Sequence, residues 1–158
     1  MNQIILGLIS AVVLVGCQSV PTKQYENLPF TAAALLSKQW EQLERFPPLY
    51  PVEEALTGNE GCVTVEYIIA PNYEIKDIKV LTASSKHFAK QAKRNVAKWH
   101  WSALPQGLLQ QAIKTATHYQ FCLETGDGHC AIKNAFENSQ CRGEDTIYVV
   151  GTRITHPR

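Results

Sequence analysis

The residues with the widest chemical capacity in this sequence are five cysteines and five histidines. A cysteine sulfur can carry a lipid, form a disulfide or ligate a metal, and a histidine can ligate a metal or transfer a proton. The histidines are scattered, and no G-x-S-x-G, H-E-x-x-H or phosphate-loop motif is present. Ser84 and Ser85 near His87 are better explained as a helix cap than as a nucleophile and its base. We therefore expect a protein that is not an enzyme and that uses no cofactor.

The sequence Leu14-Val15-Gly16-Cys17 follows an uncharged apolar run and resembles a bacterial lipobox. In that interpretation residues 1–16 are a signal peptide, and Cys17 carries the lipid that tethers the mature protein to a membrane. The apolar run, Ile4 to Val15, is about a dozen residues long, short of the ~20 that a membrane-spanning helix needs. Met1 to Gln3 departs from the usual pattern because it has no Lys or Arg. The alternative is an ordinary signal anchor with a chance cysteine.

Composition predicts one exported domain of modest size. The chain has 158 residues, with 15 Lys and Arg against 14 Asp and Glu and a formal net charge of +1. The mature chain from Cys17 is long enough for one hydrophobic core. The balanced charge argues against a general nucleic-acid binder. Export also places the remaining cysteines in an oxidising compartment, where disulfides persist.

Residues 17–46 are expected to form a tether followed by an amphipathic helix. Thr31 is a candidate N-cap, and Pro47-Pro48 would end the helix. Three apolar residues spaced i, i+4 and i+7 would share one helical face: Leu36, Trp40 and Leu43. The favoured interpretation is a helix that packs on the domain, and the alternative is a helix that lies on the membrane. A shorter helical turn is expected at 52–56.

Alternating hydrophobicity predicts an α+β fold with a small, mixed sheet. Strands are expected at 62–70, 75–82 and 110–123, with a helix over 86–101 between the second and third strands. The right-handed crossover rule places the third strand parallel to the second. The first strand then lies between them, antiparallel to both, which gives the order 2-1-3 with the helix on one face. The third strand would be an edge with unpaired backbone N–H and C=O groups.

Four cysteines remain after Cys17, and an even number in an exported domain predicts two disulfides. Cys62 begins the first strand and Cys122 nearly ends the third, so we expect these two residues to lie opposite each other on one face and to pair. Cys130 and Cys141 would then close a small loop. The alternative is a metal site that uses His129, Cys130 and Cys141, but it lacks a C-x-x-C pair and a full ligand set.

Several segments, in this order and spacing, resemble the C-terminal domain of TonB. They are Pro48-Leu49-Tyr50-Pro51, Gly61 to Tyr67, the turn Ala70 to Tyr73, Ile78 to Ser84, Phe88 to Trp101 and the loop at Pro105. Each segment alone is a weak signal, and the resemblance rests on the whole series. It covers roughly residues 47–123 and sets the domain at 47–124.

The resemblance implies a binding module, accessory to transmembrane transport, that captures an extended segment of outer-membrane receptors called the TonB box. Family members do this by adding the segment to the edge of the last strand, where main-chain hydrogen bonds give affinity and alternate side-chain pockets give specificity. Carried over to this sequence, the partner-binding edge comprises Thr115, Thr117, Tyr119 and Phe121, flanked by Tyr50 and Pro51.

Two departures distinguish this chain from the energy transducers of the family. A lipid would replace the inner-membrane helix, and residues 18–46 are too few for a long proline-rich spacer. We therefore expect binding without force transmission. Gln18 after Cys17 favours the periplasmic face of the outer membrane, with the inner membrane as the alternative. A structural or assembly lipoprotein that reuses the fold, as TolA-like domains do, is the alternative function, and a homodimer through edge strands is also open.

Residues 125–158 form a C-terminal extension beyond the usual family domain, and most of it is polar and rich in turn residues. Its stretch from Glu144 to Ile154 holds an acidic pair followed by a β-branched run. That run is similar to a segment found near the TonB box of TonB-dependent receptors. An ordinary terminal strand is the favoured interpretation. The alternative is a strand that pairs with the open edge, in the same chain or a neighbouring copy, and competes with a receptor segment.

Overall fold

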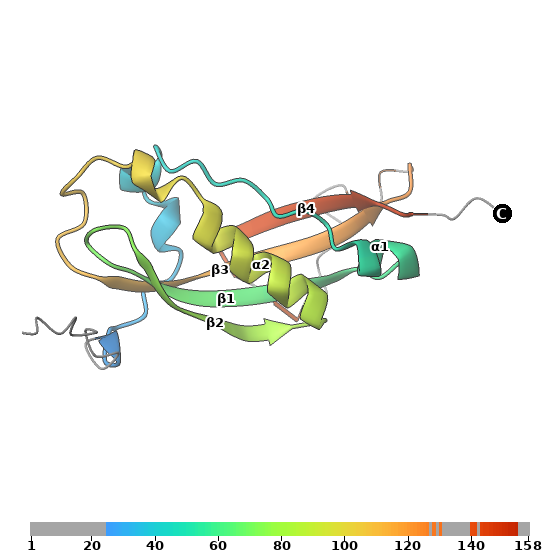
Figure 1. Cartoon of the computed structure of the whole chain (residues 1–158), viewed down its shortest axis with the longest axis horizontal. Coiled ribbons are helices and arrows are strands. Elements are labelled where there is room, and N and C mark those ends of the chain that lie inside the picture. Colours follow the sequence, from blue (N-terminus) through green and yellow to red (C-terminus); the bar gives the residue numbers. More distant parts are fainter. Residues whose placement is uncertain (1–24, 127, 129, 131–139, 142, 155–158) are drawn as a thin grey trace, which may run out of the picture.

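The computed structural model describes residues 25–126, 128, 130, 140–141 and 143–154 of the chain. Cys17, the proposed signal peptide and His129 therefore lie outside the described residues. The described part is an α+β fold in which a four-stranded sheet is covered on one face by a helix, α2 (Figure 1). Among the described residues, no helix combines the length and the apolar character that crossing a bilayer would require.

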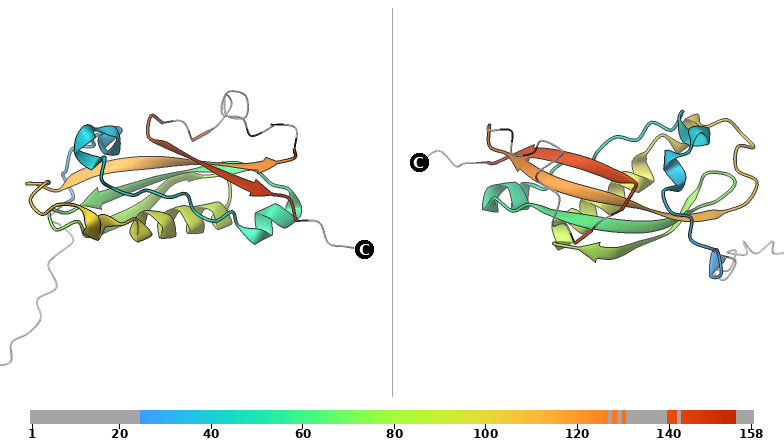
Figure 2. Two further views of the ribbon diagram at one scale, coloured as in Figure 1. Left: turned by 90° about the horizontal axis from the view of Figure 1, so that it is seen from above. Right: turned by 180° about the vertical axis from the view of Figure 1, so that it is seen from behind.

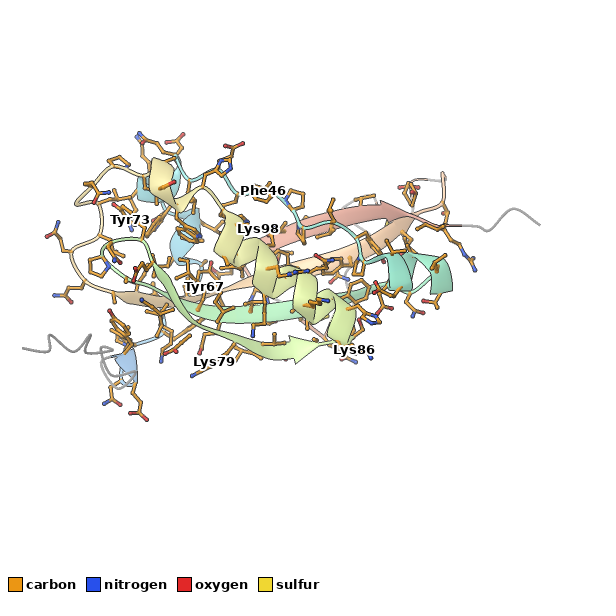
Figure 3. The ribbon with its side chains drawn as sticks, viewed as in Figure 1. Phe46, Tyr67, Tyr73, Lys79, Lys86 and Lys98 are labelled. Carbon is orange, nitrogen blue, oxygen red and sulfur yellow. A yellow bond between two sulfur atoms is a disulfide. The ribbon has the colours of Figure 1, made fainter. Side chains whose placement is uncertain are left out.

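The sheet is built around β1, Gly61–Ile69, which pairs antiparallel with both β2 and β3. Four alternate residues of β1 are fully buried beneath the helix: Val63, Val65, Tyr67 and Ile69. This confirms the predicted strand, since an alternating pattern buries every second side chain on one face. Figure 3 shows Tyr67 in this layer between the sheet and α2.

The second strand, β2, Ile75–Ala83, forms one margin of the sheet and is irregular. Its pairing with β1 shifts register twice, between Thr64 and Val65 and between Glu66 and Ile68. Asp77 has a positive φ of 47°, and Lys79 is exposed. Bulges and charged side chains are features by which edge strands resist pairing with other chains.

The helix α2, Lys86–Lys98, begins where Ser85 accepts hydrogen bonds from the backbone N–H groups of His87 and Phe88. This is the predicted N-cap geometry. The apolar face of the helix is buried against the sheet, and its ends are marked by Lys86 and Lys98 in Figure 3. The helix ends three residues earlier than predicted because Trp99 leaves the helical conformation, and a 3₁₀ turn, Trp101–Ala103, follows.

The α-helix predicted over residues 31–46 is wrong. Two 3₁₀ turns, Ala34–Leu36 and Lys38–Trp40, stand in its place. Thr31 does not cap a helix, since the first turn begins after Ala33 without a side-chain cap. The N–H of Thr31 instead donates to the carbonyl of Lys114 in β3 at 2.8 Å. Its carbonyl accepts from Thr115 Oγ1, also at 2.8 Å. These contacts with the sheet override the local helix propensity.

The apolar pattern in this N-terminal segment is nevertheless partly correct. Trp40 and Leu43 are buried in the core, whereas Leu36 is 55% exposed. The short helical turn predicted next in the chain is present as α1, Val52–Thr57. The N-terminal segment therefore packs on the domain, as favoured, but along an irregular path.

The predicted order 2-1-3 is confirmed and is extended by one strand to β2-β1-β3-β4. The third strand, β3, is Ile113–Glu124, and β4 is Thr146–Thr152. β4 lies parallel to β3 at the margin of the sheet away from β2 (Figures 1 and 2). The extension thus ends in a strand, and this strand pairs with the β3 edge in the same chain, as the alternative interpretation held. The expectation of an open edge on β3 is wrong for the half of β3 that pairs with β4.

All four described cysteines form disulfides, but the predicted pairing is wrong: Cys62 bonds to Cys141, and Cys122 bonds to Cys130. The register explains the error, because Cys62 lies opposite Gln120 and is therefore diagonal to Cys122. Diagonal neighbours are about 7–8 Å apart at Cα, beyond the usual reach of a disulfide. Both of the observed partners, Cys141 and Cys130, belong to the extension.

We predict that the two disulfides differ in their contributions to stability. Their sequence separations are 79 and 8 residues, for which the chain-entropy model gives about 4.5 and about 2.5 kcal/mol. Urea unfolding of a Cys62→Ala/Cys141→Ala variant should show the larger loss, and a Cys122→Ala/Cys130→Ala variant the smaller. Peptide mapping without reduction gives the control, and a Cys62–Cys122 peptide would contradict the pairing described here.

Candidate functional site

The outer edge of β3 is the candidate functional site, and two segments of the same chain contact it. β4 pairs along seven positions, from His118 opposite Thr146 to Glu124 opposite Thr152. The first bond comes just before β4, where the N–H of His118 donates to the carbonyl of Asp145 at 2.8 Å. At the other end of β3, Phe30 forms an isolated parallel bridge with Lys114. A strand paired on the edge of a sheet is the arrangement that strand addition produces.

The side chains predicted to face a partner along β3 instead face the core. Thr115, Thr117, Tyr119 and Phe121 are each fully buried. They lie on the face covered by α2, where Tyr119 donates to Asn95 Oδ1 at 2.9 Å. The prediction that Thr117, Tyr119 and Phe121 or their neighbours face outward toward a partner is therefore wrong for these three residues, because their positions along β3 place them on the side of the core.

A buried carboxylate holds the start of β4 to the domain. Asp145 is 2% exposed, and both of its carboxylate oxygens lie 2.7 Å from Nη1 of Arg45. Thr117 Oγ1 donates to the same carboxylate at 2.8 Å, and the Tyr67 hydroxyl lies 2.9 Å from Thr117 Oγ1. Each charge is paired, and the carboxylate has a further hydrogen bond, as burial of an ion pair requires.

Arg45 is itself held in place by neighbouring residues. Its guanidinium lies 5.4 Å from the ring centroid of Trp99, within cation–π range. The next residue, Phe46, accepts hydrogen bonds through its carbonyl from Trp99 Nε1 and Asn95 Nδ2. Sequence reasoning missed both Arg45 and Asp145, which are 100 positions apart, since no local pattern connects them.

Alternate side chains of β4 meet different surroundings. Val149 is 2% exposed and belongs to the core, whereas Val150 is 57% exposed. Gly151 lies against the ring of Tyr50: a Cβ at this glycine would be 2.5 Å from the ring. Tyr50 was predicted to flank the edge, and its ring packs edge-on against Phe88 and Phe121.

The end of β4 contacts α1. The N–H of Ile154 donates to the carbonyl of Ala55 at 3.3 Å. On the same helix, Glu54 is buried and accepts hydrogen bonds from three side chains: Ser85, Asn59 and His87. Burial alone would raise the pKa of Glu54, but the three hydrogen bonds outweigh it and lower the pKa. α1 is thereby fixed to the start of α2, and β4 is fixed at both ends.

The face of the sheet away from α2, which we call the back face, is partly covered by the extension. His118 lies there, with Nδ1 2.9 Å from Thr64 Oγ1. A Cβ on Gly143 would fall 1.6 Å from His118 Nε2, so only glycine fits where the chain crosses the imidazole. Burial lowers the pKa of His118, although the Asp145 charge and a hydrogen bond with the backbone of Cys141 act in the opposite direction.

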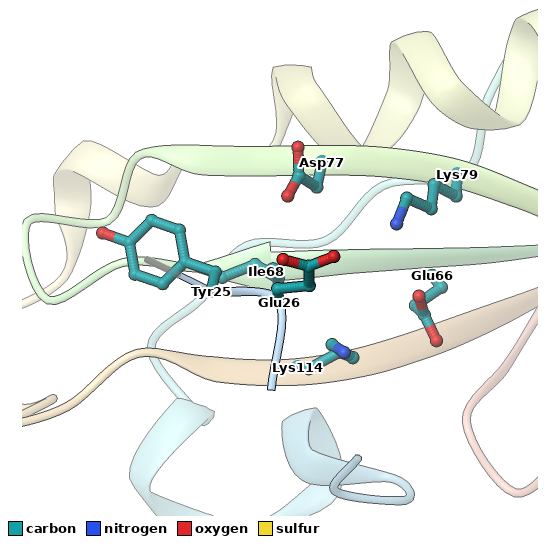
Figure 4. A pocket seen from close by; sticks show the side chains of 7 residues that line it. All are labelled: Tyr25, Glu26, Glu66, Ile68, Asp77, Lys79 and Lys114. Atoms are coloured by element: carbon teal, nitrogen blue, oxygen red, sulfur yellow. The ribbon is translucent and has the colours of Figure 1, made fainter. Parts of the chain in front are cut away.

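A polar pocket occupies the other part of the back face (Figure 4). Its lining residues come from the N-terminal segment and from all three of β1, β2 and β3: Tyr25, Glu26, Glu66, Ile68, Asp77, Lys79 and Lys114. Carboxylates and ammonium groups are interspersed, so the pocket presents no single charge to a ligand. Elsewhere among the described residues, Glu60 lies near Cys122 and Cys130, but both sulfurs are in a disulfide and cannot act as thiolate ligands.

Comparison with known proteins finds a match over the central part of the chain, which includes β3. A family described as the Gram-negative bacterial TonB protein C-terminal matches residues 47–123. Among solved structures, the chain is similar to the solution NMR structure of the Pseudomonas aeruginosa TonB CTD, with 27% identity, 53% of this chain and 89% of that chain covered, and a TM-score of 0.45. No curated protein matches the chain. Arg45 and β4 lie outside the matched residues.

We predict that stability falls as His118 becomes protonated. Its pKa is lower in the folded chain than the ~6.5 of an unfolded histidine, so the unfolded chain binds the proton more readily. The stabilisation is complete above about pH 6.5 and is lost as the pH falls through the folded pKa. Urea unfolding between pH 7.5 and 5 should show this decline, and His118→Asn should flatten it. The same substitution at the exposed His100 is the control, and an unchanged slope for His118→Asn would contradict the assignment.

Proposed function

We propose, because residues 47–123 belong to the TonB C-terminal domain family, that this chain is a lipid-anchored periplasmic module that captures an extended segment of an outer-membrane partner. Domains of this family are periplasmic in Gram-negative bacteria, and they are interaction modules and not enzymes. Their partners are envelope and outer-membrane proteins. The finer part of the proposal is the mode of binding, which is strand addition to β3.

The observation that carries the proposal is the parallel pairing of β4 with β3. This pairing supports a β3 edge that can take up a strand from His118 to Glu124, since these seven register positions are occupied. In strand addition the main chain supplies most of the affinity and alternate side chains supply the selectivity. An incoming segment would have to replace β4, so capture is an exchange of one strand for another.

A second function is favoured by the same occupied edge. If β4 stays on β3, the domain has no vacant edge there and would act as a structural or assembly lipoprotein that contacts its partner through another surface. The two functions differ in one measurable property, which is whether β4 gives way to an extended peptide.

The membrane anchor of the proposed module is a lipid on Cys17. Residues 17–24 span at most about 28 Å when fully extended, which would hold the domain close to the bilayer surface. Fractionation of cells should find the chain with membranes, and Cys17→Ser should release it to the soluble periplasmic fraction. A Cys17→Ser chain that stays with membranes, while another exported soluble protein does not, would contradict the lipid anchor.

Peptide binding tests the capture of an extended segment. We expect a labelled TonB-box peptide of an outer-membrane receptor to bind a variant lacking residues 144–158 at least ~10-fold more tightly than the full chain, because a tethered competitor has been removed. Fluorescence anisotropy measures this. The same peptide with a central proline, which lacks a backbone N–H, is the control and should not bind.

A second variant guards against failure of the truncated chain to fold. Gly151→Val keeps the full chain and should loosen β4 through contact with Tyr50. If neither variant binds the peptide while circular dichroism shows both to be folded, capture by strand addition is refuted and the assembly function is favoured.

A further inference from the structure

We infer that β4 is a built-in ligand of the β3 edge and that its sequence defines the segment which this edge accepts. The pattern is an acidic residue, an aliphatic residue four positions later and a glycine two positions after that: Asp145, Val149 and Gly151. The inference deepens the proposed function, because a partner strand would use the same edge. It rests on contacts made by Arg45, Thr117 and Tyr50.

The acidic position is recognised by charge. The Asp145 carboxylate bonds to Arg45 and to Thr117 Oγ1, at 2.7 and 2.8 Å. The Arg45 side chain is only 19% exposed, so a neutral residue in the place of Asp145 would leave a largely buried guanidinium without its counter-charge. Loss of hydrogen bonds to a charged group corresponds to roughly 10- to 100-fold in affinity.

The aliphatic position is recognised by burial. Val149 is 2% exposed and lies opposite Phe121 in the β3–β4 register. Its neighbour Val150 is opposite Cys122 and is 57% exposed. The edge therefore distinguishes one of these two valines from the other, although they are adjacent and chemically identical.

The glycine position is recognised by space. Any side chain at Gly151 would begin 2.5 Å from the ring of Tyr50. That ring cannot easily move aside, because it packs on Phe88 and Phe121 and its hydroxyl donates to the carbonyl of Asn59 at 2.5 Å. Tyr50 lies within the matched family region and Arg45 lies outside it. The β3 edge therefore recognises a strand through one residue of the matched region and one residue of the N-terminal segment.

The covalent connections of the extension let β4 leave β3 without breaking a disulfide. The bond from Cys62 reaches Cys141, which precedes Asp145 by four residues. A strand tethered through so short a connection has an effective concentration in the millimolar range. A partner segment must therefore resemble β4 closely, or be presented at high local concentration, to replace it.

The test uses the full chain, folded and then cut. A specific protease site is inserted between Gly143 and Glu144, and the protein is cleaved after folding. Exchange of the freed strand with a labelled peptide of residues 144–154 is then followed by fluorescence anisotropy.

We expect the wild-type peptide to bind. Peptides with Asp145→Asn or Gly151→Val should bind at least ~10-fold more weakly. A Val150→Thr peptide, altered at an exposed position, should bind within about twofold.

A variant of the protein identifies the residue that recognises the acidic position. After cleavage, an Arg45→Met chain should bind the wild-type and Asp145→Asn peptides with nearly equal affinity, whereas discrimination against Gly151→Val should be retained. This double comparison separates recognition by Arg45 from a general loss of stability, which would weaken every peptide alike.

The outcomes are distinct from those of the proposed function. If the 144–154 peptide binds with the expected pattern and receptor peptides do not, the inference stands and receptor capture fails. The inference is overturned if the freed strand never exchanges. It is equally overturned if peptides altered at Asp145 and Gly151 bind as well as the wild-type peptide.

Discussion

The ion pair between Arg45 and Asp145 is the interaction on which the arrangement of this molecule depends. It joins a segment before the matched residues 47–123 to a segment after them, with 100 positions between the partners. Removing one partner of a buried pair leaves an uncompensated charge, which typically costs about 3–5 kcal/mol. The pair also lies at the point where β4 begins, so the position of β4 follows from the electrostatics of the domain's two flanks.

The central part of the fold could be predicted from the sequence because its signals are local. The alternation in β1 and the Ser85 cap of α2 each reflect a repeat or a hydrogen bond within a few residues. The strand order followed from chain connectivity. The N-terminal segment could not be predicted in this way, since the backbone of Thr31 bonds to β3 and not to its own neighbours.

The candidate site was harder to predict than the fold, for two physical reasons. The resemblance placed Thr115 and Thr117 at a partner-binding edge, but their hydroxyls are satisfied within the core by the Thr31 carbonyl and the Asp145 carboxylate. The disulfide partners depended on a register difference of two residues, which separates Cys62 from Cys122. Both errors concern contacts between segments that are distant in the sequence.

The irregular margin formed by β2 has a consequence for assembly. A fibril that grows by strand pairing between sheet edges needs two edges on every subunit that can each pair with a neighbouring molecule. The register shifts between β1 and β2 and the positive φ of Asp77 make the β2 edge unsuitable for pairing with a strand of another molecule. Release of β4 would therefore permit molecules to join in closed pairs through β3, but not in open-ended polymers.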